Sequence, residues 1–209
     1  MSFLDPRFQV RSLQKGGFRA VKLQRRNRYL DFTPVDVLQF RRHSPRVPAR
    51  KASSILDSLK SGERKPLSEE GLDNLLYLAL ANALSAAELA PDEPDFLFLV
   101  AQVYAAFGPN PFTLELAEEA ASGTLELDPS YAEARLLLGI LQYRNRSFAP
   151  AIDNLERAVS EKPALLDFRT ASLLGAAYFL ENGLPRGEQF FRKHLSSGEP
   201  NGPALFCLG

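Results

Sequence analysis

Apolar residues recur at spacings of three and four over most of residues 68 to 200, a period typical of amphipathic helices. The clearest stretch runs from Leu127 to Pro163. Its marker positions are Arg135, Leu138, Gly139, Ala151, Leu155, Ala158 and Pro163. Because Gly139 and Ala151 lack bulk, two helix backbones can approach closely there, while the larger residues fill the seam. The pattern predicts a pair of antiparallel helices.

The ends of these two helices are also marked. Residues 144–147 carry no apolar stripe and are expected to form the turn between the helices. Asp128 followed by Pro129 is typical of an N-cap and a first helical position, so the first helix is expected to begin there. Pro163 lacks the backbone N–H that a helix interior needs, so it should stop the second helix.

Weaker copies of the pattern lie on both sides. The upstream copy consists of Leu97, Val100, Ala101, Tyr104, Ala117, Ala121, Thr124 and Pro129. Four extra residues fall at Gly108–Pro111, where two prolines and a glycine already favour a loop, so they should lengthen only the turn. The downstream copy consists of Ala171, Leu174, Gly175, Tyr178, Gly187 and Phe191.

A half-copy precedes the upstream copy. The spacing of a second helix is present in Ala79, Ala83, Ala86 and Pro91. Ser68, followed by Glu69 and Glu70, is the expected start of that helix. No first helix is expected before it, because Pro66 falls at the usual distance.

The spacing resembles the tetratricopeptide repeat (TPR), a helix-turn-helix unit with a large residue, two spacers, Leu-Gly, then Ala, three spacers, a large residue and a final Pro. The resemblance implies an all-α fold of about three and a half units in a short right-handed solenoid, with the repeat domain at residues 67–209. It also implies a surface that binds another protein, as in an adaptor, scaffold or assembly factor.

Charge divides the chain at nearly the same place. The formal net charge is zero, but residues 1–66 carry 16 Lys and Arg against 5 Asp and Glu, whereas residues 67–209 carry 9 against 20. This asymmetry predicts a basic N-terminal arm, residues 1–66, joined to an acidic repeat domain.

The arm contains six aromatic residues, so it is not expected to be a simple disordered tail. Residues 18–24 alternate as a strand, and residues 28–32 are expected to return beside them after a turn, which gives a hairpin. The two glycines after Lys15 are interpreted as a separate turn, because the rest of a phosphate-binding loop is missing.

Prolines mark the second part of the arm. Thr33 and Pro34 predict the start of a short helix that runs toward Arg42. The prolines and arginines of residues 44–52 are expected to form a linker to the repeats.

Residues that carry chemistry are sparse. The two histidines, His43 and His194, lie in different segments, and the single Cys207 can make neither a metal site nor an intrachain disulfide. Carboxylate pairs such as Glu118 and Glu119 are interpreted as solvated side chains. The sequence therefore predicts a non-enzyme without cofactor or metal. No segment approaches the roughly 20 apolar residues of a membrane span, and we expect a cytoplasmic protein.

In TPR proteins the first helix of each unit lines a concave face, so the resemblance also implies where a partner binds. The expected groove residues are Asp95, Phe98, Gln102, Glu133, Leu136, Ile140, Tyr143, Arg144, Arg169, Ser172 and Phe179. This mostly apolar set suits an amphipathic helix or an extended peptide. Leu136 and Ile140 stand where chaperone-binding members carry a carboxylate clamp, so that mode is not expected. The same apolar positions are equally consistent with core residues covered by the arm or a neighbouring helix.

Other functions remain open. The arm would bind nucleic acid or an anionic membrane surface through Arg25, Arg26, Arg28, Arg41, Arg42, Arg46, Arg50 and Lys51. The acidic repeats would repel such a polymer, so an adaptor whose arm docks on a second partner is favoured. A secretion-type chaperone is a further alternative. The apolar residues Leu205, Phe206 and Leu208 leave a homo-oligomer or a larger complex open as well.

Overall fold

The computed structural model describes residues 8–15, 18–25, 44–61, 69–108, 110–195 and 202–208 of the 209-residue chain. The chain divides into two compact units, residues 1–43 and residues 44–209. The helical unit therefore begins at Ser44, whereas the sequence analysis expected the repeat domain to begin at residue 67.

The described part of the first unit is an antiparallel hairpin of β1 (Phe8–Lys15) and β2 (Phe18–Arg25). Its register pairs Phe8 with Arg25 and Lys15 with Phe18. The strand expected at residues 18–24 is thus present, and it pairs with residues 8–15, a strand that the sequence analysis did not expect. The return strand expected at residues 28–32 lies outside the described residues. Two glycines separate β1 from β2 in the sequence, a favoured two-residue hairpin connection. The helix expected from Thr33 to Arg42 lies outside the described residues.

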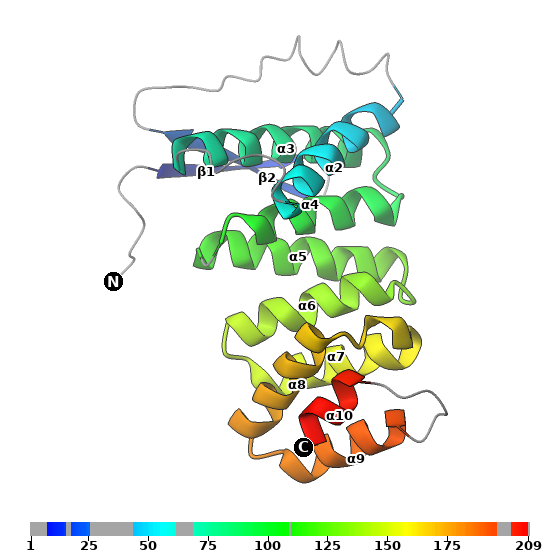
Figure 1. Cartoon of the computed structure of the whole chain (residues 1–209). Helices are drawn as coiled ribbons and strands as arrows, with labels where there is room; N and C mark the ends of the chain where they lie inside the picture. Colours follow the sequence, from blue (N-terminus) through cyan, green and yellow to red (C-terminus); the bar gives the residue numbers. More distant parts are fainter. Residues whose placement is uncertain are drawn as a thin grey trace. The chain divides into compact units, whose positions relative to one another are not determined.

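The described part of the second unit is entirely helical, which confirms the all-α fold class. Its elements are α2 (Arg46–Lys60), α3 (Glu69–Leu89), α4 (Pro94–Ala106), α5 (Pro111–Leu127), α6 (Ala132–Arg144), α7 (Phe148–Glu161), the short 3-10 helix η1 (Pro163–Leu165), α8 (Phe168–Leu180), α9 (Leu184–Leu195) and α10 (Gly202–Leu208). Each first helix packs on the helix that follows it, and the pairs stack in chain order (Figure 1).

The repeat signature lies in the buried seams of these pairs. In the second helices, the following predicted positions have no exposed surface: Ala117, Ala121, Thr124, Ala151, Leu155 and Ala158. In the first helices, Leu97, Val100, Leu174 and Tyr178 are at most 4 % exposed. Burial at both sets of positions explains why the spacing recurs, since each marks a contact between neighbouring helices.

Close approach of α6 and α7 depends on the absence of a side chain at Gly139. A Cβ atom placed there would lie 2.7 Å from Cγ of Leu155 and 3.1 Å from the carbonyl oxygen of Ala151. The predicted role of Gly139 and Ala151 as small residues at the crossing is confirmed.

The turn between α6 and α7 was predicted at residues 144–147, and it is there. Arg146 has a left-handed φ of 61°, and the N–H of Ser147 donates to the carbonyl of Gln142 at 2.8 Å. The next pair repeats this arrangement, with Asn182 at φ 56° and a 2.8 Å hydrogen bond from the N–H of Gly183 to the carbonyl of Tyr178. Both are Schellman-type helix ends, which satisfy carbonyls at the end of the first helix.

The linker expected at residues 44–52 is wrong, because α2 covers most of it. Pro45 is the N-cap of α2 and Pro48 lies in its first turn, where a backbone N–H would have no partner within the helix, so neither proline breaks it. Ala52, Ile55 and Leu56 follow on the buried face. Helix α2 is therefore the first helix of the unit that the sequence analysis treated as a half-copy.

The start expected for α6 is also wrong. This helix begins at Ala132, with Tyr131 as its N-cap, whereas Asp128 is the C-cap of α5. A carboxylate oxygen of Asp128 accepts hydrogen bonds from Ser130, from its Oγ at 2.7 Å and its backbone N–H at 2.9 Å. These bonds hold the pKa of the Asp128 carboxyl below its ordinary value. Asp128 thus shapes the loop between the two pairs and does not cap α6.

Arg135 occupies the large position of the strongest copy and is buried. Its Nε donates to a carboxylate oxygen of Glu161 at 3.1 Å, and its Nη2 donates to the carbonyl of Pro129. A buried guanidinium requires such partners, so Arg135 connects the loop before α6 to the end of α7.

Helix α10 packs on both α8 and α9. Ala204 is fully buried in the core of this last pair, and Sγ of Cys207 donates to the carbonyl of Ala171 at 3.3 Å. Leu205 and Phe206 remain 53 % and 66 % exposed. Helix α10 thus covers part of the last pair and presents apolar side chains of its own.

Two equivalent glycines give a test of the close contact in α6. Gly139→Ala is expected to lower the free energy of unfolding by about 1–2 kcal/mol, because Leu155 must move to admit the methyl group. Gly175→Ala, at the same repeat position in α8, is the matched control, since its Cβ would lie 3.6 Å from the nearest atom, Sγ of Cys207. It should raise stability by up to about 1 kcal/mol through helix propensity. Urea unfolding of both variants measures the difference, and equal effects would contradict the contact.

Candidate functional site

Two cavities lie along the first helices of the pairs. The first, here called the groove cavity, has a volume of about 480 Å³ and receives side chains from α2, α3, α4, α6 and α8. Its apolar lining includes Leu56, Leu72, Leu76, Phe98, Leu136 and Ile140. Helices far apart in the sequence thus contribute to one surface.

Seven of the eleven predicted groove residues line the groove cavity: Phe98, Gln102, Glu133, Leu136, Ile140, Arg144 and Arg169. The other four lie elsewhere. Asp95 accepts a 2.8 Å hydrogen bond from the hydroxyl of Tyr131, and the ring of Tyr143 packs against Phe148. The hydroxyl of Ser172 donates to a backbone carbonyl of its own helix, and Phe179 is 67 % exposed.

The apolar groove residues also support the core. Leu136, Ile140 and Tyr143 are partly buried and pack against the core of the last helix pair. Leu136 and Ile140 also line the groove cavity, so these two side chains contact both the core and the cavity. A substitution there would disturb folding as well as any bound partner.

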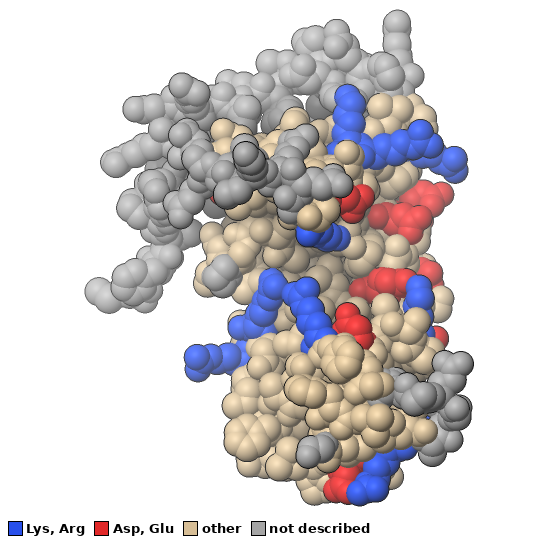
Figure 2. Space-filling view, viewed as in Figure 1, with Lys and Arg blue, Asp and Glu red and all other residues tan. Residues whose placement is uncertain are grey.

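Basic side chains surround the groove cavity. Within the described part of the chain, its lining holds the cations Lys60, Arg144 and Arg169 and one carboxylate, that of Glu133. Glu133 accepts a 2.5 Å hydrogen bond from Nζ of Lys162, which holds the pKa of the Glu133 carboxyl below its ordinary value. Figure 2 shows this side of the helical unit, with blue Lys and Arg side chains at the levels of α2 and α6. The charge of this pair cancels, so the cavity keeps an excess of cations.

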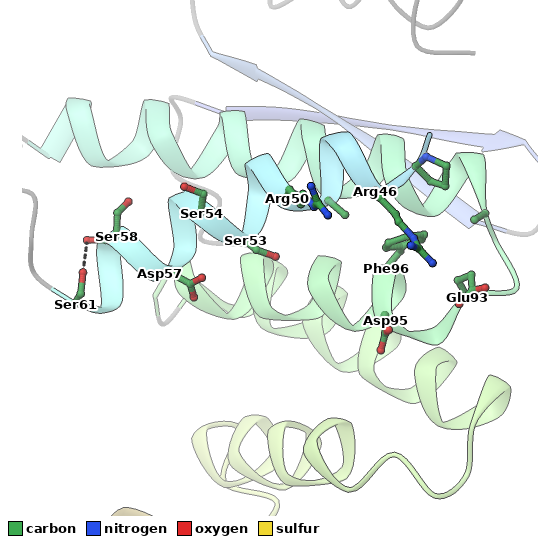
Figure 3. A pocket seen from close by; sticks show the side chains of 13 residues that line it. Arg46, Arg50, Ser53, Ser54, Asp57, Ser58, Ser61, Glu93, Asp95 and Phe96 are labelled. Carbon is green, nitrogen blue, oxygen red and sulfur yellow. Dashed lines mark hydrogen bonds between the residues drawn. The ribbon is translucent and has the colours of Figure 1, made fainter. Parts of the chain in front are cut away.

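The second cavity, here called the polar cavity, lies between α2 and the start of α4 and has a volume of about 1000 Å³. Figure 3 shows α2 contributing Arg46, Arg50 and Asp57, with Glu93 and Asp95 on the opposite side. Cations and carboxylates are mixed there, so this cavity has no strong charge preference.

The predicted basic arm is divided by the structure. Arg46, Arg50 and Lys51 are exposed on α2, inside the helical unit. Arg25 is the last residue of β2. The remaining members, Arg26, Arg28, Arg41 and Arg42, lie outside the described residues.

The sequence analysis missed the contribution of α2 to the groove cavity, namely Leu56, Leu59 and Lys60. The signal was present, since Ala52, Ile55, Leu56 and Leu59 have helical spacing. Because Pro45 and Pro48 precede these residues, the segment was interpreted as a linker and the helix was not predicted.

Within the described part of the chain, no group of three or more His, Cys, Asp or Glu side chains is placed to hold a metal ion. None of the described helices is both long and apolar enough to cross a bilayer.

No family model and no curated protein matches the chain. Solved structures do. Against pilF of Pseudomonas aeruginosa the TM-score is 0.54, at 16% identity over 83% of this chain and 68% of that one. Against a thermophilic TPR protein of Thermus thermophilus the TM-score is 0.50, at 15% identity over 78% of this chain and 98% of that one. Against MamA 41-end from Desulfovibrio magneticus RS-1 the TM-score is 0.50, at 21% identity over 70% of this chain and 75% of that one.

The helical unit is therefore a stack of helix-turn-helix repeats. It has the TPR fold that the spacing of small and large residues predicted. At these identities the likeness concerns the fold alone.

The pairing of Glu133 with Lys162 gives a pH-dependent prediction. Lys162→Met is expected to raise the pKa of the Glu133 carboxyl toward its ordinary value, as measured by NMR titration. Because the folded-state pKa is depressed, the pair stabilises the fold above the unfolded-state pKa, and this contribution is lost as the pH falls through the folded-state pKa. The two side chains are 51 % and 40 % exposed, so the contribution should stay below about 1 kcal/mol.

Arg157→Met, which removes a cation from the exposed face of α7, is the control and should leave the pKa of Glu133 unchanged. An unchanged pKa of Glu133 in Lys162→Met would show that the hydrogen bond does not form in solution.

Proposed function

We propose that this protein is a non-enzymatic adaptor whose groove cavity binds a peptide or helix of a partner protein. The observation that carries this proposal is the apolar cavity on the face of the first helices, to which α2, α4, α6 and α8 all contribute. A continuous surface built from several repeats is how stacked helical units bind extended partners.

The chemistry of the cavity supports binding more than catalysis. Its lining combines leucine, isoleucine and phenylalanine side chains with Gln102 and a few charges at the edge. Apolar side chains of a partner would displace water from this lining, and burial of apolar surface contributes about 25 cal/mol per Å². Glu133, the carboxylate among the described lining residues, is already hydrogen-bonded to Lys162, and these residues place no nucleophile beside a base.

The basic arm supplies a second contact in this proposal. Residues 1–43 carry ten Lys and Arg against three Asp and Glu, so they would attract an acidic surface of a second partner. A scaffold with two such contacts would hold two partners of one complex near each other. Cytoplasmic location stays a prediction.

Photo-crosslinking from the groove cavity tests the proposal. A photoreactive amino acid at Gln102, whose side chain lines the cavity without belonging to the apolar core, is expected to crosslink one protein partner in the native cells. The same residue at Leu78 of α3, which is 52 % exposed and outside both cavities, is the control and should not crosslink that partner. Mass spectrometry identifies the products.

The experiment is repeated with a chain that begins at Ser44. Crosslinking from Gln102 should persist, because the cavity lies wholly within residues 44–209. Loss of the partner with residues 1–43, or equal crosslinking from Leu78, would reject the groove cavity as the binding site and favour the arm.

A further inference from the structure

We infer that the groove cavity selects partner segments in which apolar anchors are flanked by Asp or Glu, although the helical unit is acidic overall. This inference rests on the proposed function and specifies the partner. Residues 44–209 carry 15 Lys and Arg against 22 Asp and Glu. From that balance alone, a basic segment would be the expected ligand. The local charges of the cavity, which include Lys60, Arg144 and Arg169, instead favour an acidic segment.

Of the carboxylates whose side chains the structure describes in this unit, Glu133 is the one that lines the cavity. Four of them, Glu115, Glu118, Glu119 and Glu126, are on α5, which contributes no residue to the lining. The single carboxylate of the lining, Glu133, accepts a hydrogen bond from Lys162. Among the described residues of the lining, Lys60, Arg144 and Arg169 therefore have no unpaired carboxylate beside them.

Two of these cations also have a structural explanation. Lys60 and Arg144 are the last residues of α2 and α6, where a positive charge is stabilised by the helix dipole. Arg144 also donates to the carbonyl of Ala105 at 3.4 Å. Their presence alone would not indicate a ligand.

Arg169 has no such explanation. It lies in the first turn of α8, where the helix dipole disfavours a positive charge. The nearby carboxylate of the N-cap, Asp167, accepts a 2.7 Å hydrogen bond from the N–H of Thr170 and is not paired with Arg169 among the described ion pairs. Among the described residues Arg169 forms no ion pair, and its side chain is exposed at the edge of the cavity. A cation held at an unfavourable position beside an apolar surface is best accounted for by an anionic group of a bound partner.

The same argument disfavours the chain's own arm as the occupant. With ten Lys and Arg against three Asp and Glu, residues 1–43 would bring further positive charge toward Lys60, Arg144 and Arg169. The apolar anchors of an acidic amphipathic segment would instead contact the apolar lining, and its flanking carboxylates would lie beside the cations.

Three synthetic peptides of about 18 residues, long enough to form a helix, test the inference by fluorescence anisotropy against the full chain. All carry leucines on one helical face, and the flanking positions are Glu in the first, Lys in the second and Gln in the third. The Glu peptide is expected to bind at least about tenfold more tightly than the Lys peptide, and its affinity should fall as salt is added. A scrambled Glu peptide without the apolar face should bind weakly, which separates the groove cavity from attraction to the arm.

Charge reversal in the protein gives the matched comparison. The double variant Lys60→Glu and Arg169→Glu should reverse the preference, so that the Lys peptide binds more tightly than the Glu peptide. The control, Arg157→Glu and Arg192→Glu, changes the net charge equally on α7 and α9 outside the cavity and should leave the preference unchanged. All four side chains are exposed, so both variants should keep the circular dichroism of the unmodified chain.

The outcomes separate this inference from the proposed function. Equal binding of the three peptides, or tighter binding of the Lys peptide by the unmodified chain, would overturn the charge selection and leave a groove that binds by apolar contact. A preference for the Glu peptide that survives Lys60→Glu and Arg169→Glu would place the selection in the arm and overturn the inference. Failure of all three peptides to bind would contradict both.

Discussion

Close backbone contact at a residue without bulk is the constraint on which the helix pairs depend. In α6 and α7 that residue is Gly139, which leaves room for Leu155 at the crossing. In α8 and α9 the room is made on the second helix, because a Cβ at Gly187 would lie 2.6 Å from the ring of Tyr178. The residue without bulk therefore lies on the first helix in α6–α7 and on the second helix in α8–α9. Stacking of the pairs, and with it the alignment of the first helices, follows from these contacts.

Alignment of the first helices gives the groove cavity a local charge that differs from the charge of the helical unit as a whole. Leu136 and Ile140 lie partly in the core and partly at the open face, so the groove cavity is held in shape by the packing that stabilises the repeats. Its charge is likewise local, since Arg169 from α8 and Lys60 from α2 meet there while the carboxylates of α5 do not. The net charge of the helical unit therefore does not describe the charge of the groove cavity.

The repeat spacing was sufficient to predict the pairs from α4 to α9, because each marker residue contacts the next helix. It failed at α2, where Pro45 and Pro48 resemble a linker although the first turn of a helix tolerates them. The strand at residues 18–24 was predicted but its pairing with β1 was not, since alternation identifies a strand but not its neighbour. Most of the predicted groove residues meet in one cavity, whereas the nearness of Lys60 to Arg169 depends on the stacking of four first helices.

The helix crossings require a residue without bulk, whereas the turns at Arg146 and Asn182 constrain only the backbone conformation. Each needs one residue that accepts a left-handed backbone, and the bonds that fix the turn come from main-chain atoms. An arginine and an asparagine both meet that demand. A lineage can therefore replace nearly every outward side chain of such a unit without altering the angle between its helices. Sequences that differ at most outward positions can therefore have the same fold, as this chain and two solved structures do at 15% and 16% identity.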